Sequence, residues 1–391
     1  MVTYPNDWKE EKIGAIFDVL AGGDVKKDFF SRSHTSVYQY EVYSNGIENR
    51  GLYGYTSKAI YPPNSLTVTA RGTIGTAYYR KDFYDAIIRL LVLIPKSDEI
   101  KPKFYEYFIN SQVQFDKENT GVPQLTVPKI KEKVVPIFLG VEQAKIVETL
   151  ECFDTYIDNI TELIEKKRNI RDGALEDLVS GRTRLDGFNN EWVSVPFNQV
   201  VVPKARIGWQ GLKKYEYLRS GYSYLIGGTD FYRGTVRLDN ISFVSKDRYD
   251  MDSNIQVTTN DVLVTKDGTI GKVALVPKLD KPATLNSGVF VFRTNSRLLP
   301  TFLYRVLSSS IFRKFIDVLS AGSTIKHLYQ KDLKNFEFMI PLDTDEQEAI
   351  AFALTSMDEE IEALENERDK IIQIREGAMD DLLTGRVRLK V

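Results

Sequence analysis

Two glycine-containing turns carry the side chains best suited to contact a ligand. Each turn reads GTIG, at residues 72–75 and 268–271, and each follows a run rich in β-branched residues. Glycines at such turns leave backbone N–H groups and flanking side chains exposed. The flanking residues differ between the two turns: Thr69, Ala70 and Arg71 precede the first, and Thr265, Lys266 and Asp267 precede the second.

These residue types can read the bases of a nucleic acid. Arginine pairs with guanine edges, and carboxylates accept hydrogen bonds from the amino group of cytosine. The two turns therefore predict nucleic-acid contacts by Thr69, Arg71, Thr73, Lys266, Asp267 and Thr269. A plain hairpin turn without a ligand is the alternative interpretation.

Aromatic and basic residues are mixed in three further segments, residues 43–58, 208–224 and 227–234. Such mixtures suit contact with phosphates and base edges. The candidates in them are Tyr53, Lys58, Lys213, Lys214, Arg219 and Arg233. Tyrosines with polar tips are also common on ordinary half-buried surfaces, so both interpretations stay open.

The last candidate is His327, in the segment STIKHLYQKDL (323–333). This segment falls where the first half of the chain has VPQLTVPKI (122–130). The two segments could line the same kind of cleft in each half, or they could simply lead into the helix that follows.

Signatures of catalysis are missing from the sequence. It has no GxxxxGK[ST] phosphate loop, no GxSxG elbow, no HExxH helix and no amino-methyltransferase tetrapeptide. Cys152 is the only cysteine and His34 and His327 are the only histidines, which excludes a disulfide, a thiolate zinc site and a histidine-rich metal site. We therefore predict no catalytic, cofactor-binding or metal-binding residue in this chain.

The turns belong to an internal repeat. DGALEDLVSGRTRL (172–185) returns as EGAMDDLLTGRVRL (376–389), and residues 142–185 align without a gap with residues 346–389. The segments before residues 142 and 346 are less alike, but their matching features occur in the same order. These features include the GTIG turns and, before them, Trp8 and Trp192. The chain is therefore two copies of one unit, each with a variable part and a well-matched part.

The matched parts are predicted to be long helices that pair. Their apolar residues follow a 4-3-4-3 spacing, which is typical of a coiled-coil seam. The seam residues are Ile146, Leu150, Phe153, Ile157, Ile160, Ile164, Ile350, Leu354, Met357, Ile361, Leu364 and Ile371. Two tandem copies can pair about an approximate two-fold axis as an antiparallel coiled coil. A solvated surface helix on a larger core is the alternative interpretation.

The variable parts mix short β-rich runs with helical stretches near 103–117 and 301–318. We therefore predict an α/β protein with internal two-fold pseudosymmetry. It consists of two tandem α/β modules, residues 1–140 and 186–340, and two long helices, residues 141–185 and 341–391. The net charges of these parts in chain order are +2, −3, +7 and −8, so the total of −2 hides two basic segments.

The N-terminus is polar and carries no signal-peptide core, and no apolar run is long enough to span a bilayer. We expect a cytoplasmic protein without a membrane partner.

The order of these features resembles the specificity (S) subunit of type I restriction-modification systems. The likeness covers essentially the whole chain. It is carried by the duplicated helices ending in LVSGRTRL and LLTGRVRL, by GVPQLTVPKIKEKVVPIFLGVEQ and DLKNFEFMIPLDTDEQ, and by the TARGTIG and KDGTIG turns. No single motif is specific, whereas their duplicated order is.

The resemblance implies a non-catalytic subunit whose two modules are target recognition domains, each reading one half of a bipartite site in double-stranded DNA. It implies that the helices hold these domains apart and dock two methyltransferase subunits. Those partners would bring S-adenosylmethionine for adenine N6-methylation, and restriction (translocase and nuclease) subunits would bring ATP and Mg²⁺. The charge of +2 on the first module gives only weak electrostatic attraction to DNA. A self-sufficient enzyme and a coiled-coil scaffold with protein-binding modules are the rival hypotheses.

Overall fold

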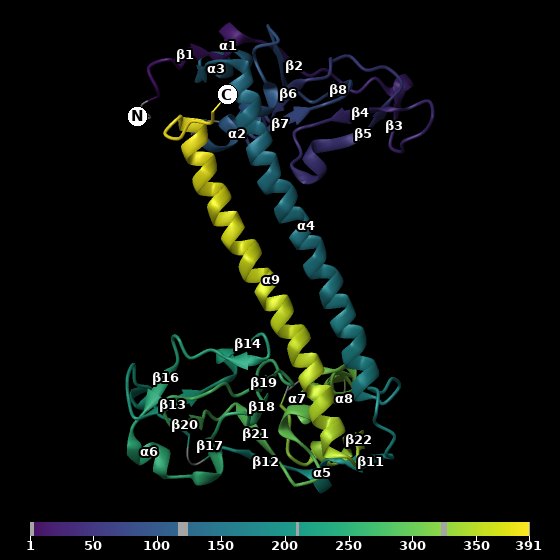
Figure 1. The fold of residues 1–391 in the computed structure, drawn as a ribbon, viewed down its shortest axis with the longest axis vertical. Helices are drawn as coiled ribbons and strands as arrows, with labels where there is room; N and C mark the ends of the chain where they lie inside the picture. The colour runs from purple at the N-terminus through teal and green to yellow at the C-terminus, as the bar shows by residue number, and fades with distance from the viewer. Residues whose placement is uncertain (1–3, 116–123, 209–210, 322–326, 391) are drawn as a thin grey trace. The chain divides into compact units, whose positions relative to one another are not determined.

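The structure, a computed structural model, describes residues 4–115, 124–208, 211–321 and 327–390 (Figure 1). The chain forms two compact units. Unit 1 comprises residues Met1–Thr161 and Asn366–Val391, and unit 2 comprises residues Glu162–Glu365. Each unit is therefore a variable part together with portions of both long helices.

Unit 1 contains two four-stranded sheets and a two-stranded ribbon. The first sheet is antiparallel, in the order β2 (Phe17–Ala21), β9 (Leu91–Pro95), β6 (Ser65–Val68) and β7 (Ala77–Arg80). The second has the order β3 (Phe30–Ser31), β5 (Leu52–Thr56), β4 (Tyr40–Tyr43) and β8 (Tyr84–Ala86), and its β4 and β8 are parallel. The ribbon pairs β1 (Lys9–Lys12) with β10 (Val134–Ile137).

Short helices cover these strands. They are α1 (Ile13–Ile16), α2 (Pro102–Gln112) and α3 (Val127–Lys131), with the 3-10 turns η1 (Lys27–Phe29) and η2 (Glu48–Gly51). α2 begins at a proline, which needs no hydrogen-bond acceptor at a first helical position. It buries Phe104, Tyr105 and Phe108 in the same core as Leu66 and Leu93 of the first sheet.

Unit 2 repeats this plan, but its first sheet has six strands in place of four. Its first sheet has the order β12 (Val201–Ala205), β21 (Val289–Thr294), β18 (Val262–Thr265), β19 (Val273–Leu275), β15 (Thr235–Val236) and β14 (Phe231–Tyr232). Its second sheet has the order β16 (Ser242–Val244), β13 (Ser223–Ile226), β20 (Ala283–Leu285) and β17 (Gln256–Val257). The ribbon pairs β11 (Trp192–Pro196) with β22 (Glu337–Pro341).

The helices of unit 2 are α5 (Phe197–Val200), α6 (Lys246–Asp250), α7 (Pro300–Ser308) and α8 (Ser310–Ala321). Its 3-10 turns are η4 (Lys214–Glu216), η5 (Gly228–Asp230), η6 (Ser253–Ile255) and η7 (Asp332–Asn335). β12, β21, β18 and β19 correspond in order to β2, β9, β6 and β7 of unit 1, and α7 corresponds to α2. The predicted β-rich runs and the helical stretch near 301–318 are confirmed, whereas the stretch near 103–117 is helical only to Gln112, and its residues 116–117 lie outside the described residues.

The two long helices are α4 (Gly140–Val179) and α9 (Thr344–Thr384). Each ends before a glycine in the left-handed region, Gly181 at φ +71° and Gly385 at φ +72°, as expected of a helix C-terminus. The residues beyond each glycine are not helical, so the helices are shorter than residues 141–185 and 341–391.

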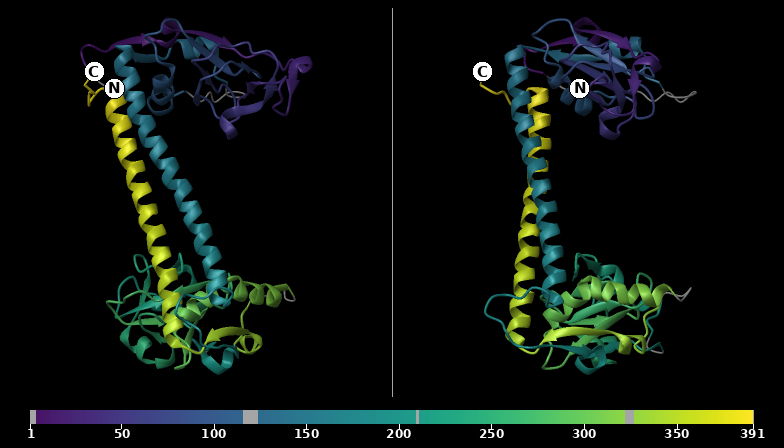
Figure 2. Two further views of the ribbon diagram at one scale, coloured as in Figure 1. Left: turned by 45° about the vertical axis from the view of Figure 1, so that its right-hand side comes forward. Right: turned by 90° about the vertical axis from the view of Figure 1, so that its right-hand side faces the viewer.

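Within each unit the portions of α4 and α9 run antiparallel. In unit 1, Arg388, just beyond α9, binds Glu142 near the start of α4, and Arg375 binds Asp154 at 2.6 Å further along. In unit 2, Arg184, just beyond α4, binds Glu346 at 2.6 Å, and Arg171 lies 3.4 Å from Asp358. Both views of Figure 2 show the start of α4 beside the end of α9 in unit 1.

The residues of the expected seam lie away from solvent. Ile146 and Leu150 belong to the core of unit 1, and Ile350 and Leu354 to the core of unit 2. Ile160, Ile164 and Ile361 are also buried, whereas Phe153, Ile157, Met357, Leu364 and Ile371 are half-buried.

The helix ends are part of the α/β cores, which is why the compact units cut across the helices. Leu382 and Leu383 of α9 lie in the core of unit 1, and Leu175 and Leu178 of α4 lie in that of unit 2. A division into modules and separate helices, as the sequence suggested, does not capture this shared packing. Within the described residues, no helix is both long and apolar enough to cross a membrane.

Candidate nucleic-acid interface

The two GTIG turns have the same internal hydrogen bonds. In unit 1, Gly75 N donates to Thr69 O at 2.8 Å, and Thr76 N donates to Thr69 Oγ1 at 2.9 Å. In unit 2, Gly271 N donates to Thr265 O and Lys272 N donates to Thr265 Oγ1, both at 2.9 Å. A buried threonine therefore closes each turn, and the two turns share one frame.

The last glycine of each turn has no room for a side chain. Gly75 has φ +91° and Gly271 has φ +78°, a conformation that favours glycine. A Cβ atom on Gly75 would lie 2.2 Å from the ring of Phe115, and one on Gly271 would lie 3.0 Å from Ile316. The path of each turn is therefore fixed by packing against its own unit.

Thr69 requires a correction. Its side chain is fully buried, and its hydroxyl is used by Thr76 N and by the carbonyl of Thr73. It follows the last residue of β6 and points into the unit, so it has no surface to offer to DNA. Arg71, Thr73 and Thr269 are exposed, and Asp267 is exposed beside the half-buried Lys266.

The segments 122–130 and 323–333 lie along the turns where they are described. Leu125 N donates to Ala70 O, and Leu328 N donates to Lys266 O, both at 2.9 Å. The two bonds occupy the same place in the two units. Residues 122–123 and 323–326 lie outside the described residues.

In unit 2, Lys266 and Asp267 of the turn form a small polar cluster with His327. His327 Nδ1 contacts Asp267 Oδ1, and Lys266 Nζ lies 3.7 Å from Asp267 Oδ2. The ring of His327 packs on Tyr329, with ring centroids 4.3 Å apart. The structure thus brings together three predicted residues that are separated by up to 61 positions.

A second loop of unit 2 holds a polar residue that sequence reasoning missed. Asn286, after β20, accepts a hydrogen bond from Tyr217 Oη at 3.3 Å. Its amide also lies near Gly227, whose N–H donates to Asp230 at 2.7 Å. Burial raises the pKa of Asp230. No sequence pattern singled out Asn286, because its place depends on the fold of the second sheet.

In unit 1 the corresponding turn is held by Asn45, which lies in the mixed aromatic and basic segment 43–58. Asn45 Oδ1 accepts from Ala70 N at 2.6 Å and from Arg71 N at 3.3 Å, and its Nδ2 donates to Ile88 O at 2.6 Å. Arg71 donates to Gln124 Oε1 at 3.2 Å. Arg71 is therefore presented on a fixed backbone beside two carboxamide groups.

Unit 1 also carries cations stacked on aromatic rings. The guanidinium of Arg32 lies 4.2 Å from the ring of Tyr53 and donates to Tyr53 O at 2.9 Å and to Tyr53 Oη at 3.1 Å. The ammonium of Lys58 lies 4.1 Å from the ring of Phe29. Both cations are exposed, which suits contact with phosphates. Sequence reasoning missed Arg32 as a candidate, although its charge is part of the net +2 of this module.

The basic candidates of unit 2 divide into two groups. Lys213, Lys214 and Arg219 are exposed around η4, and Lys213 lies 5.9 Å from the ring of Tyr215. Arg233 instead binds Glu365 of α9, a buried carboxylate that also receives Arg168 of α4. Arg233 therefore links the sheet to α9, and because its side chain is still exposed it remains a predicted DNA contact.

The part of the chain that the structure describes holds no group of three or more histidine, cysteine, aspartate or glutamate residues placed to bind a metal ion. The exposed Arg71 is suited to ion pairing with a polyanion, and the exposed Thr73 and Thr269 are suited to hydrogen bonding.

Comparison with known proteins places these features in one family. A family model described as the type I restriction modification DNA specificity domain matches residues 5–168 and 213–373. The type I restriction enzyme MjaVIII specificity subunit of Methanocaldococcus jannaschii is 23% identical over 413 residues, which cover 99% of this chain and 94% of that protein.

Two solved structures share the fold. The S subunit of a type I restriction-modification system from M. genitalium is 18% identical with a TM-score of 0.62, and 97% of each chain is covered. A chain from a study of complex assembly and conformational transition in the type I R-M system is 14% identical with a TM-score of 0.59, covering 98% of this chain and 100% of that one.

Proposed function

Because the chain belongs to the type I restriction-modification DNA specificity family, we propose that it is the DNA-recognition subunit of a type I restriction-modification complex. In this role it carries out no catalysis of its own. Unit 1 reads one half of a bipartite DNA site, and unit 2 reads the other half.

The observation that carries this proposal is the duplicated turn. Both GTIG turns have the same hydrogen-bonded frame, but one presents Arg71 and the other presents Lys266 and Asp267. A conserved frame with different side chains suits two readers of different base sequences. Arginine favours guanine edges, and aspartate accepts from cytosine.

The long helices, in our proposal, form an antiparallel coiled coil that sets the distance between the half-sites. The same ion pairs occur in both units with the roles of the helices exchanged. Glu142 with Arg388 corresponds to Glu346 with Arg184, and Asp154 with Arg375 corresponds to Asp358 with Arg171, each pair shifted by 204 positions. This repetition supports an internal two-fold pseudosymmetry.

The repeated helices also offer a partner the same surface twice. Ile170 of α4 and its equivalent Ile374 of α9 are both exposed, at 61% and 44%. Isoleucines at equivalent exposed positions suit two copies of one partner. We assign this surface to two methyltransferase subunits, which bring S-adenosylmethionine. Restriction subunits, which use ATP and Mg²⁺, would complete the complex.

The division of reading between the turns gives a direct test. Arg71→Ala is expected to relax base preference in one half-site only, and Lys266→Ala in the other only, by about 1–3 kcal/mol per lost base contact. The measurement is competition binding by the methyltransferase complex with DNA mutated at single positions. Lys81→Ala, an exposed change elsewhere in unit 1, should leave both preferences unchanged. Uniform weakening on all sequences would assign these side chains to phosphates instead.

A further inference from the structure

The connection between β8 and β9 in unit 1 has an unusual backbone. Ile88 and Arg89, its two central residues, lie in the left-handed region at φ +55° and φ +62°. Leu90 N donates to Ile87 O at 3.1 Å, so residues 87–90 form a turn in which both central residues are left-handed. Such turns favour asparagine and glycine, and a β-branched isoleucine is disfavoured in this region. The turn therefore stores backbone strain.

Packing does not explain why an isoleucine occupies this turn. Ile87 and Leu90 anchor the turn, because both are buried. Ile88 between them is 43% exposed, and Arg89 is exposed beside it. Neither the core nor the backbone conformation therefore accounts for isoleucine at position 88.

Unit 2 makes the same connection without strain. Residues 286–288 lead from β20 to β21, and Asn286 N donates to Ile226 O at 2.8 Å, just as Ile87 N donates to Tyr43 O at 2.9 Å. Residues 286–288 all lie in the described part of the chain, and none of them has a positive φ. The shared fold therefore does not require a strained turn, and strain of this kind is typical of functional sites.

The strained turn lies beside the GTIG turn of unit 1. Asn45 joins the two turns, since its side chain accepts from Ala70 N and donates to Ile88 O, both at 2.6 Å. In unit 2, Lys266 N takes the place of Ala70 N and donates directly to Gly288 O at 2.9 Å. The connection between the two sheets thus borders the GTIG turn in both units.

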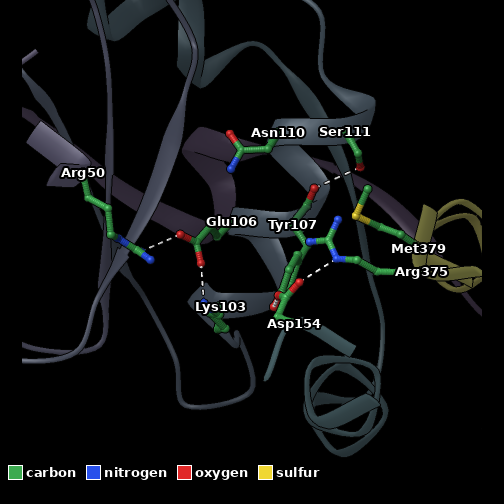
Figure 3. A pocket seen from close by; sticks show the side chains of 9 residues that line it. All are labelled: Arg50, Lys103, Glu106, Tyr107, Asn110, Ser111, Asp154, Arg375 and Met379. Atoms are coloured by element: carbon green, nitrogen blue, oxygen red, sulfur yellow. Dashed lines mark hydrogen bonds and ion pairs between the residues drawn. The ribbon is translucent and has the colours of Figure 1, made fainter. Parts of the chain in front are cut away.

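The loop that carries Asn45 is fixed at its other end by Arg50. Arg50 donates to Glu106 Oε1 of α2 at 2.7 Å (Figure 3). Ser44 N donates to Gly51 O at 2.8 Å, which closes the loop. Asn45 therefore holds the strained turn and the GTIG turn from a support that is itself tied to α2.

We propose that Ile88 contacts a base, and Arg89 a phosphate, in the half-site that Arg71 reads. An exposed apolar side chain suits contact with the 5-methyl group of thymine in the major groove. An arginine beside it suits the adjacent phosphate. The strained turn presents both side chains next to the turn of Arg71. This inference rests on the proposed reading of DNA by unit 1.

The test uses the chain in complex with its cognate methyltransferase and a duplex that carries the methylated motif. Deoxyuridine replaces one thymine at a time, which removes only the 5-methyl group. In the half-site whose reading Arg71→Ala relaxes, one such replacement should weaken binding by the wild-type complex about fourfold, as loss of one buried methyl group would give. Ile88→Asn should weaken binding to the thymine duplex by a similar factor and should be insensitive to that replacement. Asparagine tolerates the left-handed region, so this variant should melt at the wild-type temperature or above.

Arg89→Gln tests the phosphate contact separately, because it keeps the turn and removes one charge. It should weaken binding to the recognised and to an unrelated duplex alike, by about fivefold at roughly 0.15 M salt, and should lower the salt slope by about one. Lys81→Gln, which removes an exposed charge after the far end of β7, should alter neither the affinity nor the slope.

A wild-type complex that is insensitive to every deoxyuridine in this half-site would overturn the base contact, whether or not Ile88→Asn folds. Wild-type affinity in a folded Ile88→Asn variant would overturn it as well, and an unchanged salt slope in Arg89→Gln would overturn the phosphate contact. A wild-type complex without any sequence preference would instead overturn the proposed function on which the inference rests.

Discussion

Replacing Glu346 with alanine is expected to lower the free energy of unfolding of unit 2 by about 3–5 kcal/mol, because it breaks a buried ion pair. The carboxylate has no exposed surface and accepts from Arg184 at 2.9 and 2.6 Å. It also accepts from the indole N–H of Trp192 at 3.2 Å. The alanine variant leaves both groups without this acceptor at the point where α4, β11 and α9 meet.

Hydrogen exchange measured by mass spectrometry resolves this effect, since it reports on each unit separately. Protection should fall in peptides of unit 2 and stay unchanged in peptides of residues 4–115. Glu348→Ala, an exposed change two residues along the same helix, should alter stability by less than about 0.5 kcal/mol. A loss below about 1 kcal/mol for Glu346→Ala would show that this contact does not hold the helix to the unit.

Adding the methyltransferase subunit is expected to tighten specific DNA binding by about 10³-fold or more. The chain has a net charge of −2, and many of its arginines are already paired with carboxylates, as Arg375, Arg388 and Arg233 are. Exposed cations such as Arg32, Lys58, Lys213 and Lys214 can contact phosphates, but the net negative charge opposes the approach of a polyanion. The chain alone should therefore bind DNA weakly and with a strong dependence on salt.

Fluorescence anisotropy of a labelled duplex, with and without the methyltransferase, measures this difference at one fixed salt concentration. A duplex lacking the recognised bases is the control, and it should bind weakly under both conditions. Equal specific affinity with and without the methyltransferase would contradict the proposed division of labour.

Much of the architecture could be predicted because it rests on local, repeated patterns. The 4-3-4-3 spacing of apolar residues predicted α4 and α9, although both helices end before the last residues predicted for them. The β-branched runs before each GTIG predicted β6 and β18. These patterns depend only on residues that are close together in the sequence, so they can be recognised without the structure.

The side-chain partners could not be predicted, because they depend on packing between distant segments. Arg233 follows an aromatic pair and resembles a phosphate contact, yet the fold carries it to Glu365. Thr69 stands beside an exposed turn, yet its side chain is buried and its hydroxyl accepts from Thr76 N inside that turn. Arg32 was overlooked because its partner Tyr53 is 21 positions away.

The pairing of residues around Asp267 illustrates the same limit. Lys266, Asp267 and His327 were each singled out, but only the fold brings His327 onto the carboxylate. The sequence indicated which residue types suit base contact, and the structure indicates which of them act as a group.

The central claim is that the two units read separate half-sites whose spacing is set by the helices. One heptad is inserted after Ile160 in α4 and one after Asp369 in α9, positions that face each other in the antiparallel register of Asp154 and Arg375. Seven residues preserve the seam and lengthen each helix by about 10 Å, or about three base pairs at roughly 3.4 Å each. The measurement is the map of methylated adenines in cells that carry the wild-type or the extended chain with its methyltransferase. We expect the same half-site bases in both, with a spacer longer by about three base pairs in the extended chain; an active extended chain with an unchanged spacer, or with different half-site bases, would contradict the account.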